Sequence, residues 1–297
     1  MESITSIKKL KIVTDMVSDL PIDLAQKFDI EIVPLTIVKD DREMIFADQS
    51  DRENYEKDLD DYYSFLAKAE RLPTTAQPPP EKVREIYSRL LENYDAILSI
   101  NTSGKLSGTY SVAESVAREF GNRIIVIDSE QVTIPLSLLV LEAAKDKGKG
   151  LLIDEIVQRV KENMRKVRPY ATLDSLHHLV IGGRIGRVKY TLGVLLNRKP
   201  IITLVDGVLE GVAKVKESFQ IDKIIELMET DIGQAPLGAE IRVMVFYTAK
   251  QTKPKMEKLA TAVESTFKVK EMSFARIGQV VATHLGPTAW GLGYLKL

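Results

Sequence analysis

Short apolar runs rich in β-branched residues alternate with amphipathic segments in the first half of the chain. The runs KIVTD, EIVPLTIV, AILSI and RIIVID each have the length of a strand. Between the second and third of these, residues 80–94 place apolar side chains on one helical face, behind prolines that suit a helix start. This alternation predicts a parallel sheet covered by helices.

The pattern changes in the second half. Residues 151–167 form an amphipathic pattern that predicts a helix, with Pro169 ending it. Beyond it, the strand-like runs PIITL, VLEGVAKV, IRVMVFY and KVKEMSF are separated by helical segments and by turn residues such as Asp206-Gly207. We therefore predict two domains: an N-terminal parallel-sheet α/β domain of residues 1–168 and a C-terminal α+β domain of residues 169–297.

Composition narrows the class of partner. Of 297 residues, 44% are hydrophobic and 28% charged, which suits a globular protein with a sizeable core. The net charge of -1, without a dense basic face, argues against nucleic acid and favours small ligands. Cysteine is absent, so thiol chemistry and disulfides are excluded and a reducing compartment, the cytoplasm, is expected. Neither a signal peptide nor a membrane span is predicted.

The loop NTSGKLSGTYSVA follows the run AILSI and precedes a predicted helix. Ser103, Ser107 and Thr109 supply hydroxyl groups, while Gly104 and Gly108 allow backbone N–H groups to approach a ligand closely. The helix would direct the positive end of its dipole to the same point, which predicts an anion site. From the local pattern alone, however, a simple helix cap by Ser107 is the favoured interpretation.

Two well-known motifs do not fit this loop. GKLSGT lacks the GxxxxGK[ST] spacing of a P-loop, which disfavours a kinase acting alone, and the GxSxG order of a nucleophile elbow is missing. A hydrolase in which a distant histidine activates Ser103 or Ser107 stays open.

The histidines and two further segments are candidates for binding. His177 and His178 are adjacent, lack the spacing of a helical zinc motif and are predicted to cap or cover a helix, so no metal site is assigned. His284 stands among glycines and a proline, in a turn that could carry its imidazole to an interface. RLPTTAQPPP places Thr75 in a stiff extended loop, and GGRIGR exposes Arg184 for an anion or a partner.

Taken together, these segments resemble the DegV family, whose members include the fatty-acid-binding subunits of bacterial fatty acid kinase. The resemblance spans nearly the whole chain. It rests on the ordered motifs KIVTDMVSDLP, LPTTAQP, SGKLSGTYSVA, VIDSEQVTIPLSLLVLEAA, LHHLVIGGRIGR, LLNRKPIITLVDGVLEGVAKV and VVATHLGPTAWGLGY. It implies a two-domain fold that encloses a long acyl chain, with the carboxylate near the domain junction.

The resemblance also implies roles for individual residues. Asp15 matches the aspartate that follows the first strand in the family. The implied carboxylate-binding residues are Thr75, Ser107 and His284, with Ser103, Gly108 and Thr109 as supporting positions.

The implied mechanism is delivery of a substrate. A separate ATP-dependent fatty acid kinase would phosphorylate the bound carboxylate to an acyl phosphate for phospholipid synthesis. This chain would then contribute no catalytic residue and no cofactor. Arg184, Lys214 and Lys216 would contact the partner or the phosphate, although the family often has arginine where this chain has Lys216.

Several positions depart from the family pattern. Met16, Ala76 and Leu285 replace residues with hydroxyl groups, and Thr288 stands where glycine is common. Residues 134–137, Ile-Pro-Leu-Ser, replace a glycine-rich segment. These changes predict a more apolar head-group site. Two alternatives stay open: a small-molecule phosphotransferase or hydrolase acting through Ser107 or His284, and a regulatory module that binds another lipid or a small acid.

Overall fold

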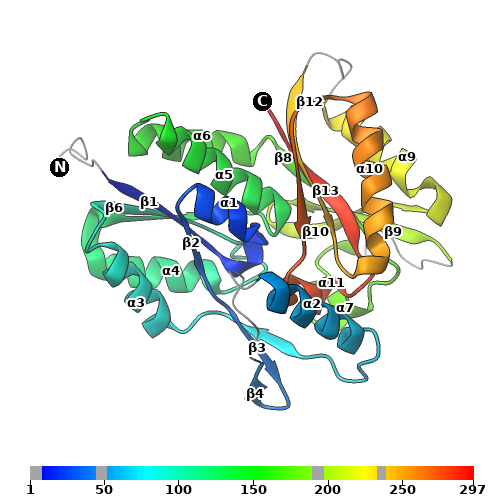
Figure 1. Cartoon of the computed structure of the whole chain (residues 1–297), viewed down its shortest axis with the longest axis horizontal. Coiled ribbons are helices and arrows are strands. Elements are labelled where there is room, and N and C mark those ends of the chain that lie inside the picture. Colours follow the sequence, from blue (N-terminus) through cyan, green and yellow to red (C-terminus); the bar gives the residue numbers. More distant parts are fainter. Residues whose placement is uncertain (1–8, 45–51, 189–196, 233–238) are drawn as a thin grey trace.

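The structure is a computed structural model that describes residues 9–44, 52–188, 197–232 and 239–297. Its N-terminal part contains a parallel sheet of four strands, as predicted (Figure 1). Each of the four apolar runs supplies one of these strands. In spatial order they are β2 (Ile30–Val33), β1 (Leu10–Asp15), β6 (Ala96–Asn101) and β7 (Ile124–Asp128).

The C-terminal part contains a mixed sheet of six strands. All neighbouring strands pair antiparallel except β11 and β12, which are parallel, so the prediction of an α+β arrangement is confirmed. The spatial order is β10 (Val208–Val215), β9 (Lys199–Val205), β8 (Val167–Thr172), β13 (Trp290–Lys296), β11 (Glu240–Tyr247) and β12 (Lys268–Arg276).

Strand β8 corrects one detail of the sequence analysis. Helix α6 (Ile153–Met164) ends before Pro169, and this proline lies inside β8, paired with Gly293 of β13. The predicted domain boundary between residues 168 and 169 therefore falls within a strand that belongs to the C-terminal sheet. Proline is tolerated there because β8 meets β9 only at Ala171 and Thr172, so the missing N–H removes no ladder bond on that side.

Helices form layers on both sides of the two sheets (Figure 1). The buried helix α5 (Ile134–Gly148) lies between the sheets and contacts β1 and β6 of one sheet and β8, β11 and β13 of the other, while α6 packs on α5. This explains the apolar run VTIPLSLLVLEAA as an interior helix. The outer layers are α3 (Pro80–Leu90) and α4 (Thr109–Ala117) on the first sheet, and α9 (Gln220–Ile232) and α10 (Lys253–Thr266) on the second.

Within the described residues, none of the helices combines the length and the apolar character that crossing a bilayer requires.

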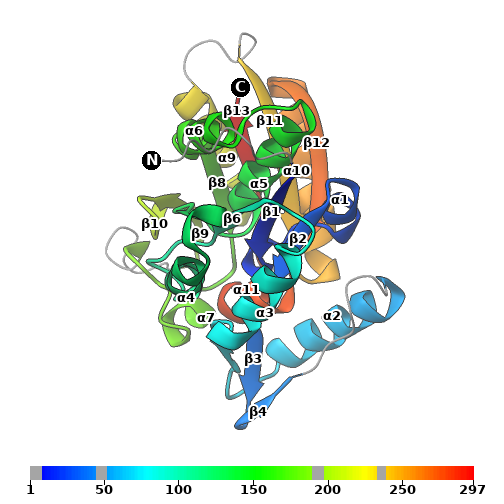
Figure 2. The same cartoon turned by 90° about the vertical axis from the view of Figure 1, so that its left-hand side faces the viewer.

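A third, smaller layer lies at one end of the molecule (Figure 2). Pro34 follows β2, and the second half of the run EIVPLTIV leaves the parallel sheet to form a small antiparallel sheet. Since β5 carries Thr75, this sheet brings the TTAQ segment beside α11. The elements here are β3 (Thr36–Lys39), β4 (Arg42–Glu43), β5 (Thr74–Ala76), α2 (Arg52–Leu66), α7 (His177–Ile181) and α11 (Gln279–Leu285). Along the chain, η1 (Met16–Ser18) and α1 (Ile22–Lys27) lie between β1 and β2.

Candidate functional site

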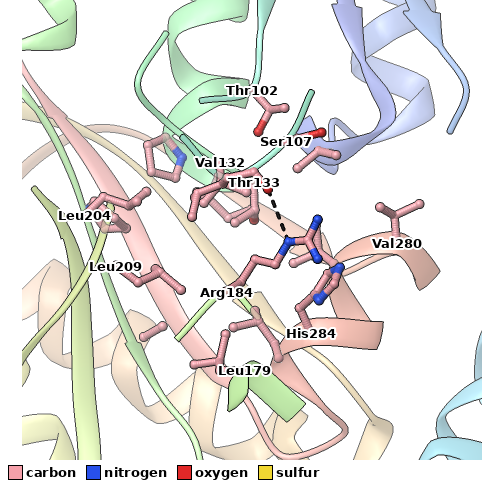
Figure 3. A pocket seen from close by; sticks show the side chains of 18 of the residues that line it. Thr102, Ser107, Val132, Thr133, Leu179, Arg184, Leu204, Leu209, Val280 and His284 are labelled. Carbon is pink, nitrogen blue, oxygen red and sulfur yellow. Dashed lines mark hydrogen bonds between the residues drawn. The ribbon is translucent and has the colours of Figure 1, made fainter. Parts of the chain in front are cut away.

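A cavity of about 100 Å³ lies between the loops at the carboxyl ends of β1, β6 and β7 and the second sheet (Figure 3). Such loops are where open parallel sheets usually bind ligands. Most of its wall is aliphatic. The lining residues are Val17, Leu35, Thr75, Thr102, Leu106, Ser107, Val132, Thr133, Ile134, Pro135, Pro169, Ala171, Leu179, Arg184, Ile202, Thr203, Leu204, Leu209, Phe246, Val280, Val281, His284 and Leu285.

Four polar side chains from separate segments meet at this cavity. Thr75 comes from β5, Ser107 from the loop before α4, Arg184 from the turn after α7 and His284 from α11. The Oγ1 atom of Thr75 lies 2.9 Å from Nε2 of His284, and in Figure 3 the guanidinium of Arg184 lies beside the imidazole. The structure thus brings together the three predicted carboxylate-binding residues and Arg184.

The hydrogen bonds of His284 define its tautomer. Burial, together with the neighbouring charges of Arg184 and His178, lowers the pKa of His284 from 6.5 to about 4, so the ring is neutral near pH 7. Nδ1 is buried without a partner among the described residues. Because a buried N–H without an acceptor is costly, the proton resides on Nε2 and is donated to Thr75. The hydroxyl hydrogen of Thr75 is then available to a ligand.

The GGR segment explains how Arg184 and His284 come so close. A Cβ atom on Gly182 would lie 2.3 Å from Nδ1 of His284, so only glycine permits this packing. Gly183 follows with a φ of 70°, which turns the chain after α7. Arg184 then donates from Nε to the carbonyl of Leu106 at 3.2 Å and from Nη1 to that of Gly182 at 2.6 Å.

Ser107 lines the cavity but does not cap α4 as the local pattern predicted, because the residue at the N-cap is Gly108 and no side-chain cap bond is formed. The hydroxyl of Ser107 lies 2.8 Å from Oγ1 of Thr109 and accepts a long, 3.3 Å bond from the N–H of Thr109, the first residue of α4. Gly108 and Thr109 do not line the cavity. Instead, Thr109 orients Ser107, and a Cβ on Gly108 would lie 1.7 Å from Oε1 of Gln77, so this glycine lets the LSGTY and TTAQP segments touch.

Ser103 lies in the same loop but faces away from the cavity. Its buried hydroxyl donates to the carbonyl of Gly207 at 2.8 Å. Asp206 and Gly207 both have positive φ and form the two-residue turn between β9 and β10. Ser103 therefore joins the loop to the second sheet. Lys216 also lies outside the lining, directly after β10, and Lys214 lies within that strand.

The amino-acid sequence is similar to known proteins along nearly its whole length. The family model described as "Uncharacterised protein, DegV family" matches residues 9–297. The chain belongs to the DegV family. It is 34% identical over 289 residues to a DegV domain-containing protein of Caldanaerobacter subterraneus subsp. tengcongensis, covering 96% of this chain and 98% of the relative.

Solved DegV structures share the fold. A DegV family protein from Thermus thermophilus, described as binding fatty acid, has a TM-score of 0.86 and 28% identity, covering 97% of this chain and 100% of that chain. DegV of Bacillus subtilis, described as a fatty acid binding protein, has a TM-score of 0.83 and 27% identity, covering 98% and 100%. The arrangement of a parallel-sheet domain and a mixed-sheet domain is therefore the DegV fold.

Asp15, in the first motif of the DegV pattern, holds one of the loops that line the cavity. The buried carboxylate of Asp15 accepts from the N–H of Thr102 at 2.7 Å and from that of Val17 at 3.0 Å. Burial raises the pKa of Asp15 to about 6, although both backbone bonds oppose the shift. Asp15 thus holds the loop after β6, in which Thr102 lines the cavity.

Three polar lining residues, Thr102, Thr133 and Thr203, are absent from the site residues predicted from the sequence. Thr203 lies in β9, where it donates to the carbonyl of Pro169 at 2.6 Å. Thr102 follows Asn101, the last residue of β6, so the rule that ligands bind beyond the carboxyl ends of parallel strands would have selected it. Thr133, with a φ of 52°, ends the loop after β7 and precedes α5. Its neighbours in sequence are apolar, and no local pattern marks it.

The departures from the DegV pattern are accommodated in different ways. Leu285 lines the cavity, whereas Met16 and Ala76 do not. Ile134 and Pro135, which replace the glycine-rich segment, also line it. A Cβ on Gly293 of β13 would lie 2.9 Å from Cγ2 of Ile134, so a glycine in the strand makes room for the larger residue on α5.

Within the described residues, no three or more His, Asp or Glu side chains gather in a way that could hold a metal ion.

Proposed function

We propose that this protein binds a long-chain fatty acid and presents its carboxylate to a separate ATP-dependent kinase, which forms the acyl phosphate. The observation that carries the proposal is the meeting of Thr75, Ser107, Arg184 and His284 at one cavity with an otherwise mainly aliphatic wall. The fatty acids bound by DegV relatives of known structure support it.

The acyl tail supplies most of the binding energy. Burying a chain of about 16 carbons at roughly 0.8 kcal/mol per CH₂ gives a gross gain on the order of 10 kcal/mol. Most of the cavity wall is aliphatic, so it can contact an acyl tail without burying polar groups that lack a partner.

The polar group of the cavity, formed by Thr75, Ser107, Arg184 and His284, suits a carboxylate. Neutral His284 donates to Thr75, whose hydroxyl then donates to one carboxylate oxygen, and Ser107 offers a second hydroxyl. The positive charge of Arg184 offsets the negative charge of the ligand in a site of low polarity. An arriving carboxylate also raises the pKa of His284 back toward its ordinary value.

We assign the transfer of phosphate to a second protein. The loop after β6 lacks the P-loop spacing, so this chain offers no recognised nucleotide site of that kind. A kinase that brings its own ATP would approach the carboxylate where Arg184 lies, and Arg184 would contact the incoming phosphate. Lys216, outside the cavity and after β10, is proposed as a contact with the body of the partner. We place the protein in the cytoplasm, where such a kinase would act.

The first experiment identifies the ligand. Native mass spectrometry of the purified protein is expected to show one bound fatty acid, and the delipidated protein is expected to take up palmitate or oleate at one site per chain. A delipidated protein that takes up neither would refute the proposal.

The second experiment locates the chemistry. Protein loaded with radiolabelled fatty acid is incubated with ATP, with and without a purified fatty acid kinase. Acyl phosphate is expected only when the kinase is present. Acyl phosphate formed by this chain alone would favour the alternative of a phosphotransferase acting through Ser107 or His284. The geometry disfavours that alternative, because Nε2 of His284 pairs with Thr75 and the hydroxyl of Ser107 with Thr109, not with each other.

A further inference from the structure

A carboxyl from the start of the chain meets the helix that carries His284. Asp19 lies between η1 and α1, in the left-handed region with a φ of 51°. Its Oδ1 atom accepts a hydrogen bond of 2.8 Å from the N–H of Gly278, a residue 259 positions away in sequence. Gly278 is the residue immediately before α11, so Asp19 caps this helix from another domain.

Helix α11 depends on such contacts for its position. It has seven residues, Gln279 to Leu285, and a helix this short has little stability of its own. From the other side, α2 holds it through the hydroxyl of Tyr62, 2.6 Å from Oγ1 of Thr283, and through the hydroxyl of Tyr63, which donates to the carbonyl of Ile277 at 2.7 Å. Asp19 is the residue of the motif KIVTDMVSDLP that accepts the Gly278 N–H at the start of α11.

The surroundings of Asp19 also link it to the cavity. Its Oδ2 atom and the hydroxyl of Thr133 are both buried, and each lacks a hydrogen-bond partner among the described residues. Burial raises the pKa of Asp19 well above its ordinary value, although the bond from Gly278 and the nearby Thr133 hydroxyl oppose this. Thr133 lines the cavity, so the carboxyl of Asp19 stands next to the cavity wall.

We propose that Asp19 is a positioning residue for the binding site: by accepting the Gly278 N–H it fixes the start of α11 and so holds His284 in hydrogen-bond contact with Thr75. This inference rests on the proposed function for its effect on the ligand, but not for its effect on His284. Without the carboxyl, the buried N–H of Gly278 has no acceptor, and α11 shifts or unwinds from its first turn.

The test compares Asp19→Gly with Asp19→Asn. Glycine accepts a φ of 51° without strain, so the first variant removes the acceptor alone. Asparagine keeps the Oδ1 acceptor, so it is the rescue variant. Asp23→Asn, an exposed carboxyl in the first turn of α1, is the matched control.

Two measurements are made on each variant. The chain has three histidines, so ¹⁵N-labelled imidazole signals of the ligand-free protein resolve three rings, and His284→Gln assigns the one of interest. We expect Asp19→Gly to shift the His284 signals and to speed fatty acid release about tenfold. Asp19→Asn and Asp23→Asn should keep wild-type signals and a release rate within about twofold.

Each outcome decides the inference. A folded Asp19→Gly variant with wild-type His284 signals, or an Asp19→Asn variant as impaired as Asp19→Gly, would overturn it. If Asp19→Gly does not fold, Asp19→Ser takes its place, and failure of both to fold would make Asp19 a stability residue only. If the wild type takes up no fatty acid, the proposed function fails, while the His284 signals still test the positioning by Asp19.

Discussion

The polar group at the cavity and the apolar wall around it are built from different kinds of structure. Thr75, Ser107, Arg184 and His284 come from a three-residue strand, a loop, a turn and a short helix. The wall comes from long strands and from α5 in the middle of the molecule. A few hydrogen bonds and glycine contacts hold the polar group, whereas dense packing holds the wall.

This difference separates stability from recognition. Wall residues belong to the shared core, so replacing one should reduce the free energy of unfolding as well as ligand binding. The polar residues contribute less to the core, so replacing one should change ligand binding, or the pH dependence of stability, while the protein stays folded near pH 7. The following predictions test this separation, from the largest expected effect to the smallest.

Phe246→Ala should cause the largest loss of stability. Phe246 lies in β11, lines the cavity and is 2% exposed. Its truncation should lower the free energy of unfolding by about 3–5 kcal/mol, because a large buried side chain leaves a void. Denaturant unfolding measures this. Phe274→Ala, in the neighbouring strand β12 but 54% exposed, is the control and should change stability little. Equal losses in both variants would contradict the assignment of Phe246 to the wall.

His284 should make stability fall as the pH falls. Its folded-state pKa of about 4 lies below the ordinary 6.5, so below pH 6.5 the unfolded chain binds a proton that the folded protein does not. The folded state should lose on the order of 3 kcal/mol between these two pH values. His284→Gln should lack this loss when both proteins are unfolded by denaturant at each pH.

Asp15 changes the stability of the folded state in the opposite direction over nearly the same pH range. Its pKa of about 6 lies above the ordinary 3.8, so it stabilises the folded state as the pH falls through this window. The comparison of wild type with His284→Gln cancels this contribution. Identical pH profiles for the two proteins would show that His284 is not buried in its neutral form.

Gly182→Ala should disturb the polar group. The new Cβ would lie 2.3 Å from Nδ1 of His284, so the imidazole must move away from Thr75. Fatty acid affinity should fall about tenfold or more, since overpacking typically costs 1–3 kcal/mol. Titration of delipidated protein measures this. Gly148→Ala, at a helical glycine with open space around it, is the control and should leave affinity unchanged.

Ser107→Ala and Ser103→Ala should have small but different effects. Loss of the Ser107 hydroxyl from the cavity should weaken fatty acid binding about three- to tenfold and leave unfolding nearly unchanged. Loss of the Ser103 bond to Gly207 should lower the free energy of unfolding by about 1 kcal/mol and leave binding nearly unchanged. The reverse pattern would show that the roles of these two residues have been exchanged.

The periodic pattern of apolar residues predicted many of the helices and strands, but it did not predict all of their boundaries or the pairing of β3 with β5. The apolar runs marked the four strands of the first sheet and four strands of the second, and the helical patterns marked α3, α6, α9 and α10. Pro169 was wrongly expected to end a helix, because a proline within a strand and one after a helix look alike locally. The departure of β3 toward β5 was missed, since pairing between residues 36–38 and 74–76 leaves no local trace.

The amino-acid sequence by itself determined the alternation of strands and helices and, through ordered motifs, membership of the DegV family, with Thr75, Ser107 and His284 as candidates. Only the tertiary structure decided that Ser107 faces the cavity while Ser103 bonds to Gly207, and that Asp19 caps the helix of His284. The physical reason is distance along the chain. Hydrophobic periodicity reports the burial of neighbouring residues, whereas these hydrogen bonds join residues more than 100 positions apart.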